Sequence, residues 1–279
     1  MSKTRTWALL AALVLAMTAA LAVGCGDDDD DGGGGGGGGG ADLGLINEGQ
    51  LLVGTDTPFP PFEIGQPPDI TGYDIDVVNE VAKRLNLDVT YQDTSFDTIF
   101  RDVALGKFDM AVAASTITPE REGTVDFSDP YYRANQALVV TTDSDITSVD
   151  QLEGATVGAQ DATTGETYAN DNTSASEVRG YPEGPDALNA LQSGQVDAVI
   201  IDEPVAQDVI EKQGGIKITQ IPTGELYGLP FAEDHDALRE QVNDALSEMK
   251  EDGTIDRLYE KYFQVKPPPQ VLEGTNTPK

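Results

Sequence analysis

The sequence has little of the material from which disulfide frameworks, metal centres and nucleic-acid interfaces are built. One cysteine, Cys25, and one histidine, His235, occur in 279 residues, so no intramolecular disulfide can form and no His/Cys cluster supports a zinc or copper site. The acidic residues lack the spacing of a calcium loop. Basic residues are also scarce, because 17 Lys and Arg stand against 49 Asp and Glu, a net charge of −32. Such a chain is repelled by phosphate backbones, so we expect no nucleic-acid partner, no metal and no cofactor.

The first residues have the composition of an export signal. Lys3 and Arg5 precede an apolar stretch over 7–23, and small residues at 22–24 lead directly to Cys25. This pattern predicts a signal peptide over 1–24. It also resembles the lipobox of bacterial lipoproteins, which implies that Cys25 is lipidated and anchors an extracytoplasmic protein to the cell membrane, at the periplasmic face or cell surface. A plain signal peptide and an uncleaved membrane anchor are the alternatives.

The segment after the cysteine has no folding content. Five aspartates over 27–31 and nine glycines over 32–40 offer no apolar side chain to bury, so residues 25–43 are expected to form a flexible, self-repelling tether. A glycine-rich phosphate loop is the alternative. It is not supported, because no Lys-Ser/Thr pair follows the glycines and no strand precedes them.

From residue 51 onward, strand-like and helix-like patterns alternate. The pattern predicts strands over 51–55, 87–91 and 109–114, a helix capped by Asp74 and running to about Asn86, and a second helix from Phe96 that ends at Gly106. This βαβαβ order is typical of a parallel sheet covered by helices.

The second half of the chain repeats this plan. Strands are expected over 155–159 and 196–201, and helices over 164–170 and 186–192. Residues 106–112 and 194–200 both contain a helix-ending glycine, a short turn and a buried strand opened by aspartate. We therefore expect two lobes, each a sheet flanked by helices.

The order of the patterns also predicts domain boundaries. Lobe 1 is expected over 44–135, lobe 2 over 136–222, and a return segment of lobe 1 over 223–264, where apolar residues at 238–263 follow helical spacing. Extended stretches over 134–142 and 219–228 would carry the chain between the lobes twice and form a hinge. Residues 265–279, with three prolines at 267–269, are expected to be disordered.

Polar and aromatic side chains follow the ends of the predicted strands. In open α/β sheets, ligands bind beyond the carboxyl ends of the strands. Those positions carry Phe59, Arg121 and Asp202 with several hydroxyl residues. An α-amino acid needs the same set, namely a guanidinium for its carboxylate, a carboxylate for its ammonium and apolar walls for its side chain.

Several short motifs in order make the chain similar to a known family. They are Gly54-Thr55-Asp56, Pro61-Phe62-Glu63, Gly72-Tyr73-Asp74-Ile75-Asp76, Ile117-Thr118-Pro119-Glu120-Arg121, Asp126-Phe127-Ser128-Asp129-Pro130-Tyr131-Tyr132 and Asp252-Gly253-Thr254. Over about 51–263 the chain resembles the polar-amino-acid family, family 3, of type II periplasmic or extracellular solute-binding proteins of ABC transporters. The resemblance implies a two-lobed α/β fold with mostly parallel sheets and a two-strand hinge. It also implies a monomeric, non-enzymatic receptor that closes on a free amino acid and delivers it to an ABC-transporter permease.

The resemblance assigns roles at the backbone end of the ligand. Arg121 would clamp the carboxylate with the Thr116 hydroxyl and backbone N–H groups at Ala114 and Thr116. Thr163 and Thr164 would add contacts from the second lobe, and Asp202 would bind the ammonium.

At the side-chain end, Phe59 and Phe96 would sandwich the ligand. Asp56 would lie at its far end, with Gln160 and Asp161 opposite, which favours a neutral-polar or cationic side chain.

Each assignment has an alternative. Arg121 could be a surface arginine, Asp202 could cap the following helix, and Phe59 and Phe96 could be core residues. An enzyme on the same fold, a cyclohexadienyl or arogenate dehydratase, is the alternative function and would need an acid near the ligand ring. A sensor acting through a partner is a third class.

Overall fold

The computed structural model describes residues 42–276. The expected signal peptide, Cys25 and all but the last two residues of the expected tether lie outside these residues. Of those two, Leu43 already packs against the core.

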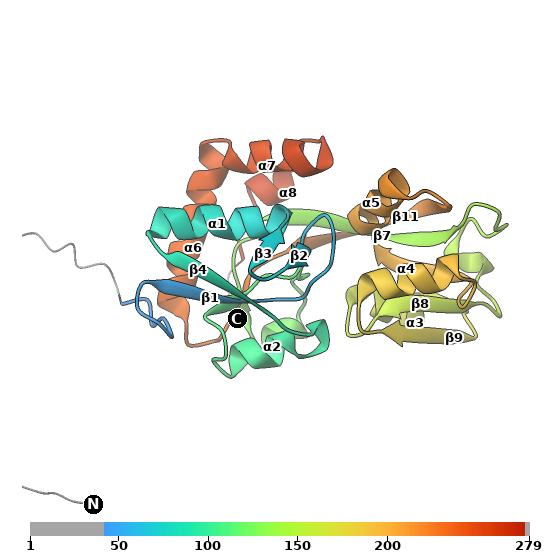
Figure 1. Cartoon of the computed structure of the whole chain (residues 1–279), viewed down its shortest axis with the longest axis horizontal. Coiled ribbons are helices and arrows are strands. Elements are labelled where there is room, and N and C mark those ends of the chain that lie inside the picture. Colours follow the sequence, from blue (N-terminus) through green and yellow to red (C-terminus); the bar gives the residue numbers. More distant parts are fainter. Residues whose placement is uncertain (1–41, 277–279) are drawn as a thin grey trace, which may run out of the picture. The chain divides into compact units, whose positions relative to one another are not determined.

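Lobe 1 is built on a three-stranded parallel sheet in the order β4-β1-β5. Strand β1 (Gln50–Thr55) lies between β4 (Asp88–Asp93) and β5 (Met110–Ala111), and both pairings are parallel. Helices α1 (Tyr73–Leu85) and α2 (Phe96–Ala104) connect these strands, and α6 (Asp236–Glu251) and α7 (Thr254–Phe263) return to pack beside α1 (Figure 1). The βαβαβ prediction is confirmed.

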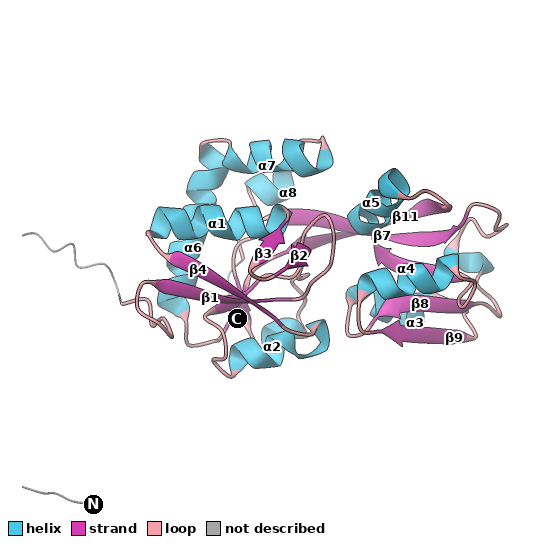
Figure 2. Cartoon of the chain, in the orientation of Figure 1, coloured by secondary structure: helices cyan, strands magenta, loops and turns pink. Residues whose placement is uncertain are grey.

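Lobe 2 contains a five-stranded sheet in the order β11-β7-β10-β8-β9. Strands β8 (Thr156–Gln160), β9 (Glu177–Tyr181) and β10 (Ala198–Asp202) are parallel, and β7 (Tyr132–Thr141) is antiparallel to both β10 and β11 (Ile216–Tyr227). Helices α3 (Thr164–Asn172), α4 (Gly184–Gln192) and α5 (Glu203–Lys212) flank the sheet (Figure 2). The two-lobed α/β fold class is confirmed. Strand β9 was not predicted, because its polar sequence Glu-Val-Arg-Gly-Tyr shows little apolar alternation.

The remaining elements are short. They are the hairpin β2 (Ile64–Gln66) with β3 (Asp69–Thr71), the pair β6 (Asp126–Phe127) with β12 (Pro230–Phe231), 3₁₀ turns at Arg121–Gly123 and Val149–Gln151, and α8 (Pro269–Leu272).

Strands β7 and β11 carry the chain between the lobes. Their antiparallel register runs from Thr141↔Ile216 in lobe 2 to Tyr132↔Tyr227, with an irregularity between Ile221 and Glu225. A further bridge joins Tyr227 to Thr116 of lobe 1. Both strands therefore belong to the lobe 2 sheet at one end and to lobe 1 at the other.

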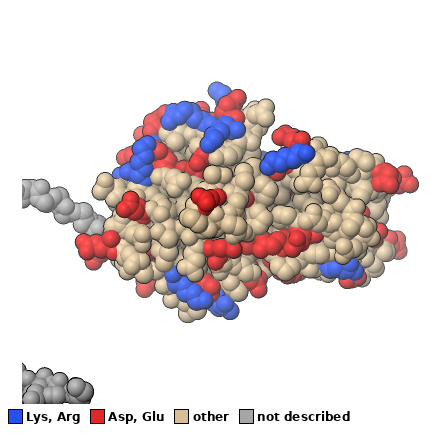
Figure 3. Space-filling view, viewed as in Figure 1, with Lys and Arg blue, Asp and Glu red and all other residues tan. Residues whose placement is uncertain are grey.

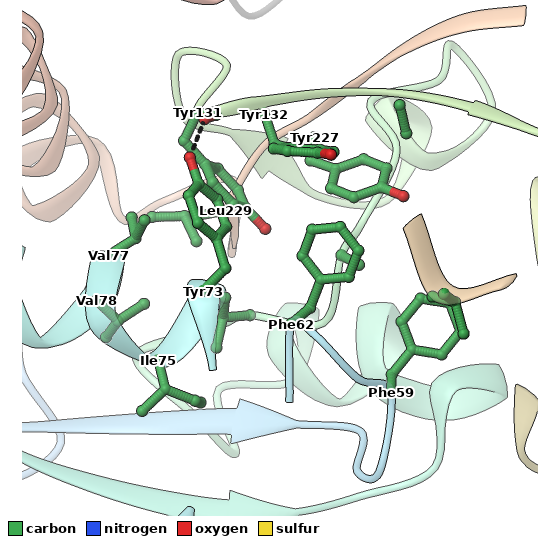
Figure 4. Packing of buried hydrophobic residues seen from close by; sticks show 14 of the residues in the cluster. Phe59, Phe62, Tyr73, Ile75, Val77, Val78, Tyr131, Tyr132, Tyr227 and Leu229 are labelled. Atoms are coloured by element: carbon green, nitrogen blue, oxygen red, sulfur yellow. Dashed lines mark hydrogen bonds between the residues drawn. The ribbon is translucent and has the colours of Figure 1, made fainter. Parts of the chain in front are cut away.

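A cluster of aromatic rings fixes the lobe 1 end of these strands (Figure 4). Phe62 meets Tyr132 and Tyr227 edge-on at centroid distances of 5.0 and 5.4 Å. The Tyr73 hydroxyl donates to the Tyr131 carbonyl at 2.8 Å. Such ring pairs stabilise the fold beyond the free energy gained from area burial, so the lobe 1 ends of β7 and β11 are held rigidly.

Two expectations from the sequence are wrong. Asp74 does not cap α1: Gly72 is the N-cap, and the buried Asp74 carboxylate instead accepts hydrogen bonds from the Ala114 N–H and the Tyr131 hydroxyl, both at 2.8 Å. Glycine is required at position 72, because its φ is 137° and an added Cβ would lie 1.9 Å from the Phe62 carbonyl oxygen.

The segment 265–276 is also not disordered. Val271 on α8 is fully buried, and the Asn276 N–H donates to Asp129 at 2.7 Å. Two buried apolar residues, Pro267 and Val271, and tertiary hydrogen bonds hold this Pro-rich segment in place. The composition of the segment gives no sign of these contacts.

Candidate functional site

A pocket lies between the two lobes, beyond the ends of β1, β5, β8 and β10. The lining contains the nine residues expected to contact the ligand directly and also Gln160, which was expected opposite Asp56, whereas Asp161 is absent from it. With Ala113 in addition, the lining residues are Asp56, Phe59, Phe96, Ala113, Ala114, Thr116, Arg121, Gln160, Thr163, Thr164 and Asp202.

Arg121 is the positive charge of the pocket. It begins the 3₁₀ turn after Thr118-Pro119, and its N–H is held by the Thr118 hydroxyl at 3.2 Å. The guanidinium lies over the rings of Phe96 and Phe100, at 5.1 and 4.6 Å from their centroids, an arrangement that favours a cation. Arg121 is therefore not a solvated surface residue.

The same guanidinium contacts both lobes. Nη1 donates to the Thr116 carbonyl at 2.8 Å in lobe 1, and Nη2 donates to the Ala162 carbonyl at 3.1 Å in lobe 2. Burial lowers the pKa of Arg121 to about 10, although the nearby carboxylates of Glu225 and Asp202 raise it. The group is a cation at neutral pH, and its hydrogen bonds connect the two lobes.

Glu225 of β11 lies beside Arg121 and was not anticipated from the sequence. Its Oε2 accepts from the hydroxyls of Thr116 and Thr164, one from each lobe and both at 2.7 Å. A hydroxyl has one proton to donate, so in this arrangement neither threonine hydroxyl can donate to a ligand. The expected role of Thr116 as a hydroxyl donor thus requires an exchange of partners.

The Ala114 N–H is likewise occupied. Ala114 has a left-handed backbone, with φ 44°, and its N–H donates to Asp74. It was expected to donate to a ligand carboxylate, and that part of its assignment is wrong. Ala114 lines the pocket, and Asp74 supports its unusual conformation.

Asp202 supplies negative charge from lobe 2. It ends β10 and is 7% exposed. Although it occupies the N-cap position of α5, its side chain makes no capping hydrogen bond, so the capping alternative is wrong. Its Oδ1 accepts instead from Gln136 Nε2 at 3.2 Å and from the Tyr227 hydroxyl. Burial, followed by the charge of Glu225, raises the pKa of Asp202 to about 7, although Tyr227 and Arg121 lower it.

Asp56 lies at the other end of the pocket. It follows β1 and is 3% exposed. Gln160 Nε2, at the end of β8, donates to its Oδ2 at 2.7 Å across the lobes. Burial raises the pKa of Asp56 to about 7, and the charges of Asp93 and Asp97 act in the same direction, whereas Gln160 and the Phe96 amide lower it. Asp161, expected opposite Asp56, does not line the pocket.

Two aromatic side chains form the walls. Phe59 is held on the loop after β1 by paired backbone hydrogen bonds with Glu63, at 2.9 and 3.1 Å, and Phe96 starts α2. Both belong to apolar clusters and also line the pocket, so the core and wall interpretations hold together. Phe59 also meets lobe 2, because an added Cβ at Gly184 would lie 2.8 Å from its ring.

Two further properties concern residues 42–276 alone. They contain no group of three or more His, Cys, Asp or Glu side chains placed to hold a metal ion. None of the helices described there has the length and apolar composition needed to span a bilayer.

The fold is that of a two-lobed α/β protein with a polar pocket between its lobes. Comparison with known proteins identifies the family. Residues 51–265 match the model of bacterial extracellular solute-binding proteins, family 3, and the chain belongs to this family.

The relatives include binding proteins for different amino acids. The chain is 32% identical to the L-cystine-binding protein TcyJ of Escherichia coli K12 over 235 residues, covering 80% of this chain and 87% of that protein. It superposes on an ancestral arginine-binding protein bound to arginine with a TM-score of 0.73 at 38% identity, covering 77% and 98% of the two chains. An ancestral amino acid-binding protein described as a precursor of cyclohexadienyl dehydratase gives a TM-score of 0.73 at 36% identity, covering 77% and 96%. The family is thus shown, and the three relatives named here are binding proteins.

Proposed function

We propose that the protein captures a polar or basic amino acid outside the cytoplasmic membrane by closure of its lobes and delivers it to the permease of an ABC transporter. The observation that carries this proposal is the placement of opposite charges around one pocket, with Arg121 on lobe 1 and Asp202 on lobe 2. An α-amino acid presents the matching pair, a carboxylate and an ammonium.

Binding in this arrangement couples directly to closure. Arg121 forks the α-carboxylate and Asp202 accepts from the α-ammonium, while Thr163 and Thr164 contact the carboxylate from lobe 2. A ligand that contacts both lobes is bound more tightly by the closed form, so it shifts the population toward that form. The permease then reads the closed form, and the crossing strands β7 and β11 serve as the hinge.

Thermal-shift screening of the twenty amino acids and cystine tests this function. A ligand present at 100 times its dissociation constant stabilises the native state by about 2.7 kcal/mol. We expect one chemical class of amino acid to raise the melting temperature strongly, with titration calorimetry giving one site per chain. If no amino acid binds ligand-stripped protein, the proposed function is wrong.

The membrane anchor is a separate part of the proposal. Cys25 is expected to carry the lipid, and the acyl chains hold the protein beside the permease. Cys25→Ser should leave amino-acid affinity unchanged and move the protein from the detergent phase to the aqueous phase in phase separation. Membrane partitioning of the serine variant would show that the lipobox interpretation is wrong.

The dehydratase alternative has one observation in its favour. Asp56, with its pKa raised to about 7 beside two aromatic walls, could protonate a leaving hydroxyl. Two other acids follow strands of lobe 2, Asp161 after β8 and Glu203 after β10, but neither lines the pocket. The Glu203 carboxylate accepts hydrogen bonds from Gln220 and Asn135 instead. Incubation with prephenate and arogenate, followed by detection of aromatic products, separates the two functions. Turnover that is lost in Asp56→Asn would establish the enzyme.

A further inference from the structure

Two acidic side chains lie together inside lobe 1. Acidic residues are spread over the surface of the molecule (Figure 3), but Glu63 and Asp74 have no exposed surface and neither lines the pocket. Among residues 42–276, neither carboxyl group forms an ion pair with Lys or Arg. Two neighbouring carboxylates that are buried without a counter-ion repel each other, so they cannot both stay ionised.

The backbone brings these two residues together at the start of α1. The Tyr73 N–H donates to the Pro61 carbonyl at 3.0 Å, and the Asp74 N–H donates to the Phe62 carbonyl at 3.3 Å. The Glu63 and Asp74 side chains are hydrogen-bonded to each other. An ionised carboxylate has no proton to donate, so this hydrogen bond requires a proton on one of the two acids.

The hydrogen bonds around the pair favour the negative charge on Asp74. Its Oδ2 accepts from the Ala114 N–H and the Tyr131 hydroxyl, both at 2.8 Å. It also lies in the first turn of α1, where the helix dipole favours an anion. If both acids were ionised, Oδ1 of Asp74 and both carboxyl oxygens of Glu63 would have no hydrogen-bond partner within the described part of the chain. A proton on Glu63 gives Oδ1 its donor.

The electrostatic surroundings favour the same assignment. Burial, followed by the charge of Asp74, raises the pKa of Glu63 well above its usual range, and Asp56 acts in the same direction. Burial also raises the pKa of Asp74, but its hydrogen bonds with Glu63, Ala114 and Tyr131 lower it. The other titratable groups near the pair are hydroxyls, those of Tyr73, Tyr91 and Tyr131. Glu63 therefore holds a proton more tightly than Asp74 does.

The pair connects three parts of the molecule that shape the pocket. The Glu63 backbone forms the paired hydrogen bonds that hold Phe59, one of the pocket walls. Ala114, with its left-handed backbone, lines the pocket. Tyr131 directly precedes the crossing strand β7, and its carbonyl accepts from the Tyr73 hydroxyl (Figure 4). A change in the hydrogen bonding of the pair would therefore reach both the walls and the hinge.

We propose that Glu63 keeps its proton and donates it to the Asp74 carboxylate, and that this buried hydrogen bond holds the pocket walls in place. Glu63 is then a positioning residue that acts on the ligand through Phe59 and Ala114. The expected effect on amino-acid binding rests on the proposed function, whereas the position of the proton does not.

Infrared difference spectroscopy locates the proton, because the C=O stretch of a protonated carboxyl group is separate from the carboxylate bands. We use ligand-stripped full chain at pH 9, above the pKa of about 7 of Asp56, Glu183 and Asp202. The protonated-carboxyl band should persist in the unmodified chain and in the control Asp56→Asn, and it should be lost in Glu63→Gln. A missing band at pH 9, or a band that is unchanged in Glu63→Gln, overturns the proposal.

Titration calorimetry with arginine, glutamine and cystine tests the positioning role. Glu63→Gln keeps the shape of the side chain and an N–H donor toward Asp74, so affinity should change less than ~3-fold. Glu63→Met has a similar shape but no donor. It leaves Asp74 Oδ1 unpaired, so we expect a loss of about 10-fold for each amino acid that binds. Asp74→Asn removes the accepting charge and should lose at least as much.

The outcomes separate the proton from the wider function. If Glu63→Gln binds as weakly as Glu63→Met, or if Glu63→Gln and Asp74→Asn lose affinity equally, Glu63 does not act as the protonated donor and the proposal is wrong. Binding of none of the amino acids to the unmodified chain contradicts the proposed function, and the infrared band still decides where the proton lies. If Glu63→Met does not fold, the comparison of Glu63→Gln with Asp74→Asn decides the positioning role.

Discussion

The two ends of the pocket differ in how their charges are satisfied. At the Arg121 end, charges of opposite sign lie near one another and already have protein partners: Arg121 donates to two carbonyls, Asp202 accepts from Tyr227, and Glu225 accepts from two threonines. At the Asp56 end, the charged groups near the carboxylate are acidic, and the buried Asp56 Oδ1 has no hydrogen-bond partner.

This difference suggests that the two ends of the pocket recognise different parts of the ligand. The Arg121 end matches the carboxylate and ammonium that every α-amino acid carries, so it provides affinity without discrimination. The Asp56 end remains unsatisfied until a ligand with the right side chain enters, and unpaired buried groups discriminate strongly between ligands. Mutations at the first end should weaken all amino acids alike, and mutations at the second should change their ranking.

Removal of Arg121 should have the largest effect. Arg121→Ala leaves the ligand carboxylate unpaired in a buried site, which costs about 3 kcal/mol or more, about 100-fold in affinity, for every amino acid. Arg121→Lys should also bind poorly, because an ammonium cannot form the planar bidentate pair. Titration calorimetry measures both variants. Wild-type affinity in Arg121→Ala would mean that the carboxylate binds elsewhere.

Asp202→Asn tests the other charge at the same end. The variant keeps an oxygen that can accept from Tyr227 but loses the charge that the ammonium needs, so we expect a loss of about 2 kcal/mol, roughly 30-fold, for all amino acids. Small-angle scattering should show ligand-induced compaction in the wild type and not in the variant at the same ligand concentration.

The control for Asp202 is a ligand without the α-amino group, which should bind both forms poorly and about equally. The melting temperature of the empty variant should change little. If Asp202→Asn binds amino acids normally but melts at a much lower temperature, Asp202 has a structural role and the ligand ammonium binds elsewhere.

The strand ends could be predicted from the sequence because local signals define them. The positions of Phe59, Arg121 and Asp202 follow from strand-like runs and from the rule that ligands lie beyond strand ends, and all three line the pocket. Phe96 and Ala114 were assigned by the family resemblance alone. The family motifs pointed to the same positions. Local pattern and topology thus sufficed for the parallel core of lobe 1 and for the location of the pocket.

The partners of these residues could not be predicted in the same way. Glu225 reaches Thr116 and Thr164 only because β11 crosses between the lobes beside β7. Asp74 has the position of a helix cap, but a distant N–H and hydroxyl compete for its carboxylate. Contacts between residues far apart in the sequence decide such roles, and these contacts leave no periodic pattern in the sequence.

The buried acids at both ends of the pocket should make the stability of the empty protein depend on pH. The pKa values of Asp56 and Asp202 are raised from 3.8 in the reference state to about 7, so the folded state binds protons more tightly than the unfolded state. The stability that these groups contribute is therefore fully present below the reference pKa of 3.8 and is lost as the pH rises from there through 7. We therefore expect the melting temperature of the empty protein to fall between pH 5 and pH 8.

Two measurements sharpen this prediction. In Asp56→Asn, the melting temperature should fall less steeply with rising pH. Saturating arginine should also reduce this fall more than saturating glutamine does, because only a cationic side chain can balance the negative charge of Asp56. A melting temperature that rises from pH 5 to pH 8 in the empty protein would contradict the sign of both shifts.

The smallest expected effect concerns Glu225. A substitution there tests whether its carboxylate competes with the ligand carboxylate or instead supports ligand binding. Its carboxylate occupies the hydroxyl protons of Thr116 and Thr164 and lies near Arg121, so it resembles an internal substitute for the ligand carboxylate. Glu225→Gln removes a negative charge that repels the incoming anion and frees hydroxyl donors more readily. We expect amino acids to bind about fivefold more tightly, close to 1 kcal/mol, with no change in ranking. Glu120→Gln removes an exposed charge near Arg121 without touching either threonine and should have less than half this effect. Weaker binding of all amino acids to Glu225→Gln would show instead that the carboxylate orients the two threonines and supports closure.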